Sequence, residues 1–167
     1  MAISRSLIFL IGYRATGKTT VARLLADRIS WNWVDADQII ETRHGQTIRQ
    51  IFADEGEAGF RAKEWRILDE LCLLKQHVVA TGGGVVLRPA SRELLRESGL
   101  VVWLTADPET IWQRLQADPS TFERRRCLRP GRSSLSHSCA SGHEIEPDRC
   151  RPVRRLSEKL GVARVMT

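Results

Sequence analysis

One short segment constrains the fold of this chain more than any other. Residues 12–19 read GYRATGKT, with the spacing G-x-x-x-x-G-K-T, and the apolar run LIFLI at residues 7–11 directly precedes them. Behind the segment, apolar residues recur with the three- and four-residue spacing of an amphipathic helix. They are Val21, Leu24, Leu25 and Ile29. The sequence therefore predicts a buried strand, a glycine-rich loop and a helix over residues 18–29.

Each fixed position of the glycine-rich loop has a separate task in phosphate binding. Gly12 and Gly17 allow backbone conformations that a Cβ would block, so successive N–H groups can point at phosphate oxygens. Lys18 can reach the β- and γ-phosphates of a nucleotide, and Thr19 can offer its hydroxyl to Mg²⁺. A chance glycine-rich turn is disfavoured by the strand before the loop and the helix after it. We expect this P-loop to bind ATP and Mg²⁺, with nucleotide contacts from Gly12, Arg14, Ala15, Thr16, Gly17, Lys18, Thr19 and Thr20.

The chain alternates short apolar runs with amphipathic segments up to about residue 117. Further strands are expected to end at residue 34 and to cover residues 77–81 and 100–105, and helices are expected at 38–43, 48–53, 57–75, 90–97 and 108–117. This alternation is typical of a parallel sheet. A chain of 167 residues, 42% of them apolar, fits one domain around one core. The sequence therefore predicts a three-layer α/β fold with helices on both faces of a parallel sheet.

Two acidic residues, Asp35 and Asp37, follow the second expected strand. The carboxyl ends of parallel strands are where such sheets place their ligands. On an extended segment both carboxylates can point the same way, one toward a metal ion and one toward an acceptor hydroxyl. The alternative is that Asp37 only caps the next helix, as Asp often does.

A second candidate group is the pair Arg61 and Glu64, three residues apart on the helix expected at 57–75. At that spacing the carboxylate can hold the guanidinium in place, and a fixed guanidinium suits a planar anionic group such as a carboxylate. An exposed surface ion pair is the alternative, and such pairs contribute little.

A third candidate is the run Gly82, Gly83 and Gly84, which follows the strand expected at 77–81. Three consecutive glycines lose much chain entropy on folding and contribute no side-chain packing. A close approach of the backbone to a ligand would explain them, and a plain loop would also fit.

These features occur together in an order that resembles the shikimate kinase family. The resemblance rests on the P-loop at 12–19, the D-x-D at 35–37, the F-R-x-x-E at 60–64 and the G-G-G at 82–84, and it covers about residues 5–122. It implies a P-loop fold like that of the nucleoside monophosphate kinases. It also implies transfer of the γ-phosphoryl group of ATP to shikimate, a step of aromatic amino-acid biosynthesis, with Mg²⁺ as cofactor.

The same resemblance implies roles on the acceptor side. Asp37 would bind the ring hydroxyls of shikimate and orient or deprotonate the attacking one. Arg61 would hold the shikimate carboxylate with Glu64 behind it, and the backbone of residues 82–84 would contact the ring.

On the nucleotide side, the resemblance makes Lys18 a catalytic residue and assigns Mg²⁺ to Thr19 and Asp35, the latter through water. The family also carries a lid arginine, often followed by Pro and shortly by Leu. Arg125 is its nearest counterpart when Leu128 is aligned, and Arg126 stands where the proline is expected. We therefore count Arg125 among the expected catalytic and ATP-binding residues.

The last quarter of the chain departs from the pattern. Its formal net charge of +6 arises wholly in residues 123–167, where basic residues outnumber acidic ones by 11 to 5. The family's last helices, its second substrate arginine and its final strand are not predicted there. We therefore divide the chain into a kinase core at 1–122 and an atypical basic tail at 123–167. Our hypothesis is that residues from about 126 come from a shifted reading frame, which translation of the coding DNA in the other frames would test.

Two other interpretations of the tail are disfavoured. Residue types that bind metals occur at Cys127, His137, Cys139, His143 and Cys150. No C-x-x-C pair occurs among them, which argues against a zinc site. The arginines could bind nucleic acid, but no aromatic residue follows Phe122 to stack on bases.

The sequence also suggests a location and rivals to the leading hypothesis. The apolar run at 7–11 is far too short to span a membrane and has no signal-cleavage pattern behind it. We expect a cytoplasmic monomer whose partners are ATP and shikimate. The rivals are a related small-molecule kinase, such as a gluconate kinase, and a P-loop protein that binds nucleotide without transferring phosphate.

Overall fold

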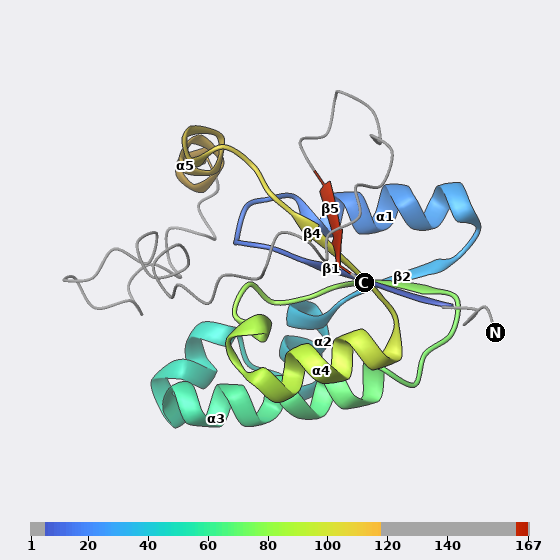
Figure 1. The fold of residues 1–167 in the computed structure, drawn as a ribbon. Helices are drawn as coiled ribbons and strands as arrows, with labels where there is room; N and C mark the ends of the chain where they lie inside the picture. The colour runs from blue at the N-terminus through green and yellow to red at the C-terminus, as the bar shows by residue number, and fades with distance from the viewer. Residues whose placement is uncertain (1–5, 118–162, 167) are drawn as a thin grey trace.

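The computed structural model describes residues 6–117 and 163–166, which form a five-stranded sheet between layers of helices (Figure 1). The strand order is β2-β3-β1-β4-β5. Strands β1 to β4 pair in parallel, as the βα alternation predicts. These strands are β1 (Leu7–Ile11), β2 (Asn32–Asp35), β3 (His77–Ala80) and β4 (Leu100–Leu104).

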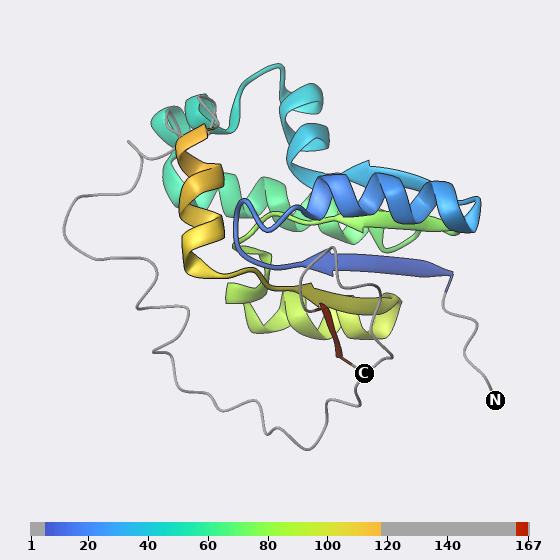
Figure 2. The same ribbon diagram turned by 90° about the horizontal axis from the view of Figure 1, so that it is seen from above.

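The helices lie on both faces of the sheet, which confirms the three-layer prediction. The α-helices are α1 (Lys18–Ile29), α2 (Ala36–His44), α3 (Ile48–Leu71), α4 (Pro89–Ser98) and α5 (Pro108–Ala117), and a 3₁₀ helix η1 covers Val85–Leu87. Helix α1 covers one face, whereas α2, α3 and α4 cover the other (Figures 1 and 2). Among the described residues, no helix is long and apolar enough to cross a membrane.

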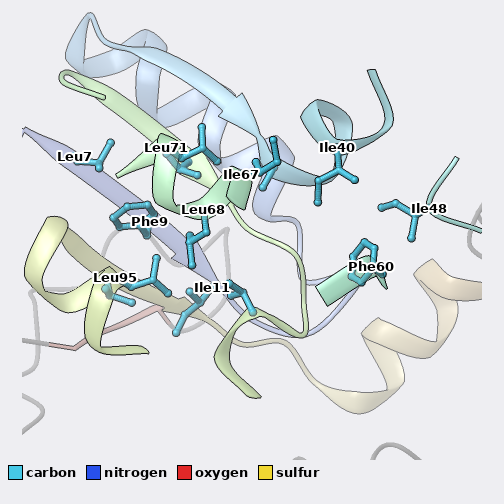
Figure 3. Packing of buried hydrophobic residues seen from close by; sticks show 14 of the residues in the cluster. Leu7, Phe9, Ile11, Ile40, Ile48, Phe60, Ile67, Leu68, Leu71 and Leu95 are labelled. Carbon is cyan, nitrogen blue, oxygen red and sulfur yellow. The ribbon is translucent and has the colours of Figure 1, made fainter. Parts of the chain in front are cut away.

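Alternating side chains of β1 pack into two separate hydrophobic clusters, one on each face of the sheet. Leu7, Phe9 and Ile11 pack with residues of α3 and α4 (Figure 3), whereas Leu10 packs with Ala22 and its neighbours on α1. A central strand that is buried on both faces reads as a continuous apolar run. This is why LIFLI shows no polar alternation.

Helix α3 joins two segments that the sequence predicts as separate helices. Thr47 caps its start in a reciprocal capping box with Gln50. At Gly56 the backbone has φ 70 and ψ −172, so the helix is kinked between the two expected segments. The helix ends at Leu71 rather than at residue 75, with Cys72 as its C-cap, and the chain then passes through Gln76, with φ 55, before it enters β3.

The edge of the sheet next to β4 carries a strand that the sequence does not predict. No strand is predicted in residues 123–167, yet β5 (Ala163–Met166) pairs antiparallel with β4, from Leu104 opposite Ala163 to Val101 opposite Met166. A segment of only four residues is too short to carry a periodic signal. Its structure comes from backbone pairing with the otherwise open edge of β4, which local sequence does not encode.

Candidate functional site

The P-loop joins the carboxyl end of β1 to the amino end of α1. Gly12 has φ 145 and Gly17 has φ 93, and both values favour glycine. A Cβ on Gly12 would collide with the carbonyl oxygen of Leu104. Gly17 is the N-cap of α1 and supplies no side-chain cap, so the first amides of the helix are left for an anion.

Lys18 folds back over this loop. Its Nζ donates hydrogen bonds to the carbonyl oxygens of Gly12 (2.9 Å) and Tyr13 (2.8 Å). Burial lowers the Lys18 pKa to about 8, while the nearby charges of Asp37 and Asp35 oppose that shift. The same two carboxylates that follow β2 therefore lie close enough to the P-loop lysine to act on its charge.

The other predicted P-loop residues either stabilise the conformation of the loop or lie next to it. Thr16 is buried and its Oγ1 donates to the Tyr13 carbonyl at 2.8 Å, while Ala15 has φ 61. Thr20 is exposed in the first turn of α1. Arg14 is half-buried, and its charge further lowers the Lys18 pKa.

Asp35, rather than Asp37, caps the helix after β2. Its Oδ1 accepts the backbone N–H groups of Asp37 (3.0 Å) and Gln38 (3.4 Å), and its Oδ2 accepts the Thr19 hydroxyl at 2.6 Å. Because this cap starts α2 at Ala36, Asp37 lies in the first helical turn. The expectation of an extended segment through both carboxylates, and the alternative of a cap by Asp37, are therefore wrong.

Arg61 and Glu64 form a partly buried ion pair rather than a surface one. The Arg61 NH1 and Glu64 Oε2 atoms lie 2.7 Å apart, and the side chains are 31% and 10% exposed. Glu57 adds a weaker contact to NH2 at 3.4 Å. The other oxygen of Glu64, Oε1, is buried and has no hydrogen-bond partner among the described residues. A buried acceptor without a partner is costly, and it marks a place where a ligand or water would be stabilising.

The triple-glycine loop, residues 82–84, lies beside this Oε1 atom of Glu64. A Cβ on Gly82 would lie 2.9 Å from Oδ1 of Asp37 and 2.9 Å from Oε1 of Glu64. A Cβ on Gly84 would lie 2.6 Å from both terminal nitrogens of Arg61. The loop therefore passes directly against all three predicted acceptor-side side chains, and a Cβ at Gly82 or Gly84 would collide with them.

The middle glycine links this group to the P-loop. A Cβ on Gly83 would lie 3.4 Å from the backbone nitrogen of Arg14 and 3.6 Å from the carbonyl oxygen of Gly12. One short loop thus touches the nucleotide-binding loop with its centre and the acceptor candidates with its two ends.

Sequence reasoning missed two features beside the site. Phe52 stacks on Phe60 with ring centroids 4.6 Å apart, and the Arg61 guanidinium lies 5.3 Å from the Phe60 centroid. Arg114 of α5 donates to the Ala15 carbonyl at 3.1 Å, across 99 residues of sequence. The helical spacing of Phe52 and Phe60 indicates only burial, and no local signal identifies Arg114.

Some expected residues lie outside the described part of the chain. They are Arg125 and the cysteines and histidines from Cys127 to Cys150. The boundary at residue 122 also lies there and stays a prediction. Within residues 6–117 and 163–166, no group of three or more His, Cys, Asp or Glu residues is arranged to hold a metal ion.

Comparison with known proteins decides the family. A family model described as shikimate kinase matches residues 14–142, which is more than half of the chain. The chain belongs to the shikimate kinase family. A shikimate kinase from Rhodopirellula baltica is 46% identical over 121 residues, and one from Symbiobacterium thermophilum is 47% identical over 107 residues.

The coverage of these two shikimate kinases is partial. The matched regions span 72% and 64% of this chain but only 65% and 62% of the relatives, which is less than two thirds of their length. A solved structure of a shikimate kinase from Acinetobacter baumannii in complex with shikimate gives a TM-score of 0.66 at 37% identity, and the match covers 75% of each chain. The family-model match, residues 14–142, includes the P-loop from Arg14 onward and the acceptor-side residues described above.

Proposed function

We propose that this chain transfers the γ-phosphoryl group of ATP to a hydroxyl of shikimate, giving 3-phosphoshikimate. Membership of the shikimate kinase family supports the reaction class, and the relative solved with shikimate supports the acceptor. The observation that carries the proposal is the triple-glycine loop, which brings the P-loop and the residues Asp37, Glu64 and Arg61 into one site.

The P-loop would bind the triphosphate of ATP. The uncapped amides at the start of α1 would point at phosphate oxygens, and Lys18 would exchange its two carbonyl contacts for the β- and γ-phosphates. Negative phosphate oxygens would raise the Lys18 pKa again and keep the amine charged. Lys18 would then neutralise charge that develops during transfer.

Thr19 and Asp35 fit a magnesium ion. The Thr19 hydroxyl and Asp35 Oδ2 are 2.6 Å apart at the mouth of the P-loop, and oxygen atoms are the ligands that Mg²⁺ prefers. Few protein ligands suffice, because Mg²⁺ keeps several waters and takes the rest of its ligands from substrate phosphates. When bound, Mg²⁺ would neutralise charge on the β- and γ-phosphates.

Asp37 would receive the proton of the attacking hydroxyl. In the transfer, a bond forms from the acceptor oxygen to the γ-phosphorus, and the bond from that phosphorus to the bridging oxygen of ADP breaks. The charge of Asp37 acts on Lys18, so the base and the phosphate-binding amine lie near each other, as in-line transfer requires.

Arg61 would bind the carboxylate of shikimate. Its guanidinium is held by Glu64 at 2.7 Å and is 31% exposed, so it is fixed and still accessible. A planar guanidinium can bind a carboxylate through two parallel hydrogen bonds. This contact would place the ring over the triple-glycine loop.

A coupled assay of ADP release from the purified chain tests the proposal, with shikimate and gluconate as alternative acceptors. We expect ADP release that depends on shikimate and saturates with it. ADP release with gluconate but not with shikimate would show that shikimate is not the acceptor. Tight ATP binding without turnover on either acceptor would show a nucleotide-binding protein that no longer transfers phosphate.

A further inference from the structure

The segment after the triple-glycine loop is held only partly by its own side chains, because Val85 lies in the buried core and Val86 packs against it. It runs through η1 into α4, and its internal backbone bonds join Val85 N to Gly82 O at 3.3 Å and Leu87 N to Gly84 O at 3.0 Å. Val85 is buried, but Leu87 is 68% exposed. Three glycines contribute no side chains. The position of the glycines therefore depends on these two valines and on contacts from other elements.

Two arginines add contacts of this second kind. Arg92 of α4 reaches back and donates from NH1 to the carbonyl oxygens of Val86 (2.7 Å) and Leu87 (3.4 Å). The guanidinium of Arg88, which follows η1, lies 4.3 Å from the ring centroid of Trp65 on α3. Arg92 thus fixes the segment to α4, and Arg88 fixes it to α3.

The second attachment reaches the acceptor side directly. Trp65 is the next residue after Glu64 and lies one turn beyond Arg61 on α3. The stack of Arg88 on Trp65 therefore ties the end of the segment to the helix that carries both acceptor-side residues. Helices α3 and α4 lie side by side on the same face of the sheet (Figure 1).

An adjacent cavity makes these attachments more important. About 240 Å³ of space lies between α3 and the segment, bordered by Arg61, Gly84, Trp65, Leu87 and Arg88 among others. Leu87, which borders this space, is 68% exposed and contributes little packing there. At the same time, the loop backbone passes close to the Arg61 guanidinium, because a Cβ on Gly84 would lie 2.6 Å from its terminal nitrogens.

We propose that Arg92, together with the Arg88–Trp65 pair, positions the triple-glycine loop for acceptor binding. Arg92 is a positioning residue and does not itself touch the acceptor. It holds the Val86 carbonyl, which sets Gly84 against Arg61 and Gly82 against Asp37 and Glu64. The effect on the acceptor rests on the proposed function, whereas the effect on the loop does not.

Steady-state kinetics of Arg92→Ala test the role in the reaction. We expect the KM for shikimate to rise on the order of tenfold, the factor equivalent to about 1.4 kcal/mol, while the Kd for ATP stays unchanged. Arg92→Lys should recover part of the loss, because its amine can still donate to one carbonyl. Arg88→Ala should raise the same KM by about two- to fivefold, as expected for an exposed cation–π contact. Arg96→Ala, one turn further along α4, is the matched control.

Hydrogen exchange of the unliganded protein tests the loop itself. In Arg92→Ala, amides of residues 82–88 should exchange faster, while those of the P-loop at 12–19 keep the wild-type rate. Unchanged exchange at 82–88, or an equal loss of acceptor and nucleotide binding, would overturn the proposal. If Arg92→Ala does not fold, the same measurements on Arg92→Lys and Arg88→Ala test the proposal instead. Faster exchange in a protein whose wild type does not phosphorylate shikimate would refute the proposed function and leave the positioning role intact.

Discussion

The nucleotide half and the acceptor half of this site are built in different ways. The P-loop takes its glycines, lysine and threonine from one stretch at 12–19, between a strand and a helix that confirm it locally. The acceptor half takes Asp37 from α2, Arg61 and Glu64 from α3, and residues 82–84 from the loop after β3. A local motif is preorganised by its own backbone. A dispersed site depends on the packing between its elements.

This difference predicts that damage to one half leaves the other intact. Changes in the P-loop should abolish nucleotide binding and spare the acceptor, and changes around the triple-glycine loop should do the reverse.

Removing the P-loop lysine should have the largest effect. In Lys18→Ala we expect ATP affinity to fall by about a hundredfold or more, because charge-assisted hydrogen bonds contribute about 1.5–3 kcal/mol each. Calorimetric titration with ATP measures the loss. Lys75→Ala, an exposed lysine beyond α3, is the matched control. Equal loss of shikimate binding in Lys18→Ala would show that the two halves are not separate.

Removing the acceptor-side guanidinium should come next. Arg61→Ala should raise the KM for shikimate by about ten- to a hundredfold, the equivalent of one lost charge-assisted bond, and leave the Kd for ATP intact. Arg66→Ala, an exposed arginine on the same helix, is the control. Our assignment of Arg61 fails if nucleotide binding falls by the same factor.

The glycine that faces this guanidinium should be nearly as sensitive. In Gly84→Ala the new methyl group would meet Arg61 at 2.6 Å, so the arginine has to move and the KM for shikimate should rise by about tenfold. In Gly83→Ala the nearest atom is 3.4 Å away, so a smaller rise is expected. Measuring the KM for shikimate of both variants under the same conditions tests whether the effect follows the distance to the nearest atom. A larger effect from Gly83→Ala would contradict the geometry.

The smallest predicted effect is a pH dependence confined to the nucleotide half. Because the Lys18 pKa is lowered to about 8, the free protein loses this charge as pH rises through 8. The Kd for ATP should therefore increase by about fivefold between pH 8 and 9 as the amine deprotonates. Titrations at several pH values measure this slope, which should disappear in Lys18→Ala. A slope that persists in that variant would assign the titration to another group.

The lowered pKa of Lys18 also makes the free energy of unfolding depend on pH. The unfolded chain, with an ordinary lysine near 10.5, binds more protons than the folded chain between about pH 8 and 10.5. The Lys18 contribution to the free energy of unfolding therefore rises with pH across this window and is constant below it.

The sequence predicted the parts of the molecule whose signals are local. Strand β1, helix α1 and helix α5 have the expected bounds, because strand, loop and helix residues follow one another without interruption. Asp37, Arg61, Glu64 and the triple glycine lie together as predicted, although each had a plausible structural alternative when taken alone.

The remainder depends on contacts between distant segments. Asp35, which caps α2, also accepts a hydrogen bond at 2.6 Å from the hydroxyl of Thr19, sixteen residues away. Arg114 reaches Ala15 across 99 residues, and β5 pairs with the edge of β4. None of these pairings leaves a periodic pattern in the residues that make it.

The direction of β5 offers a practical advantage. It begins opposite Leu104, whose carbonyl oxygen would collide with a Cβ on Gly12 of the P-loop, and runs back to place Met166 opposite Val101. The last described residue therefore lies toward the end of the sheet remote from the site. A fluorophore or surface tether attached beyond Met166 should leave ATP and acceptor access undisturbed, so immobilised-protein binding measurements can report on both halves in one experiment.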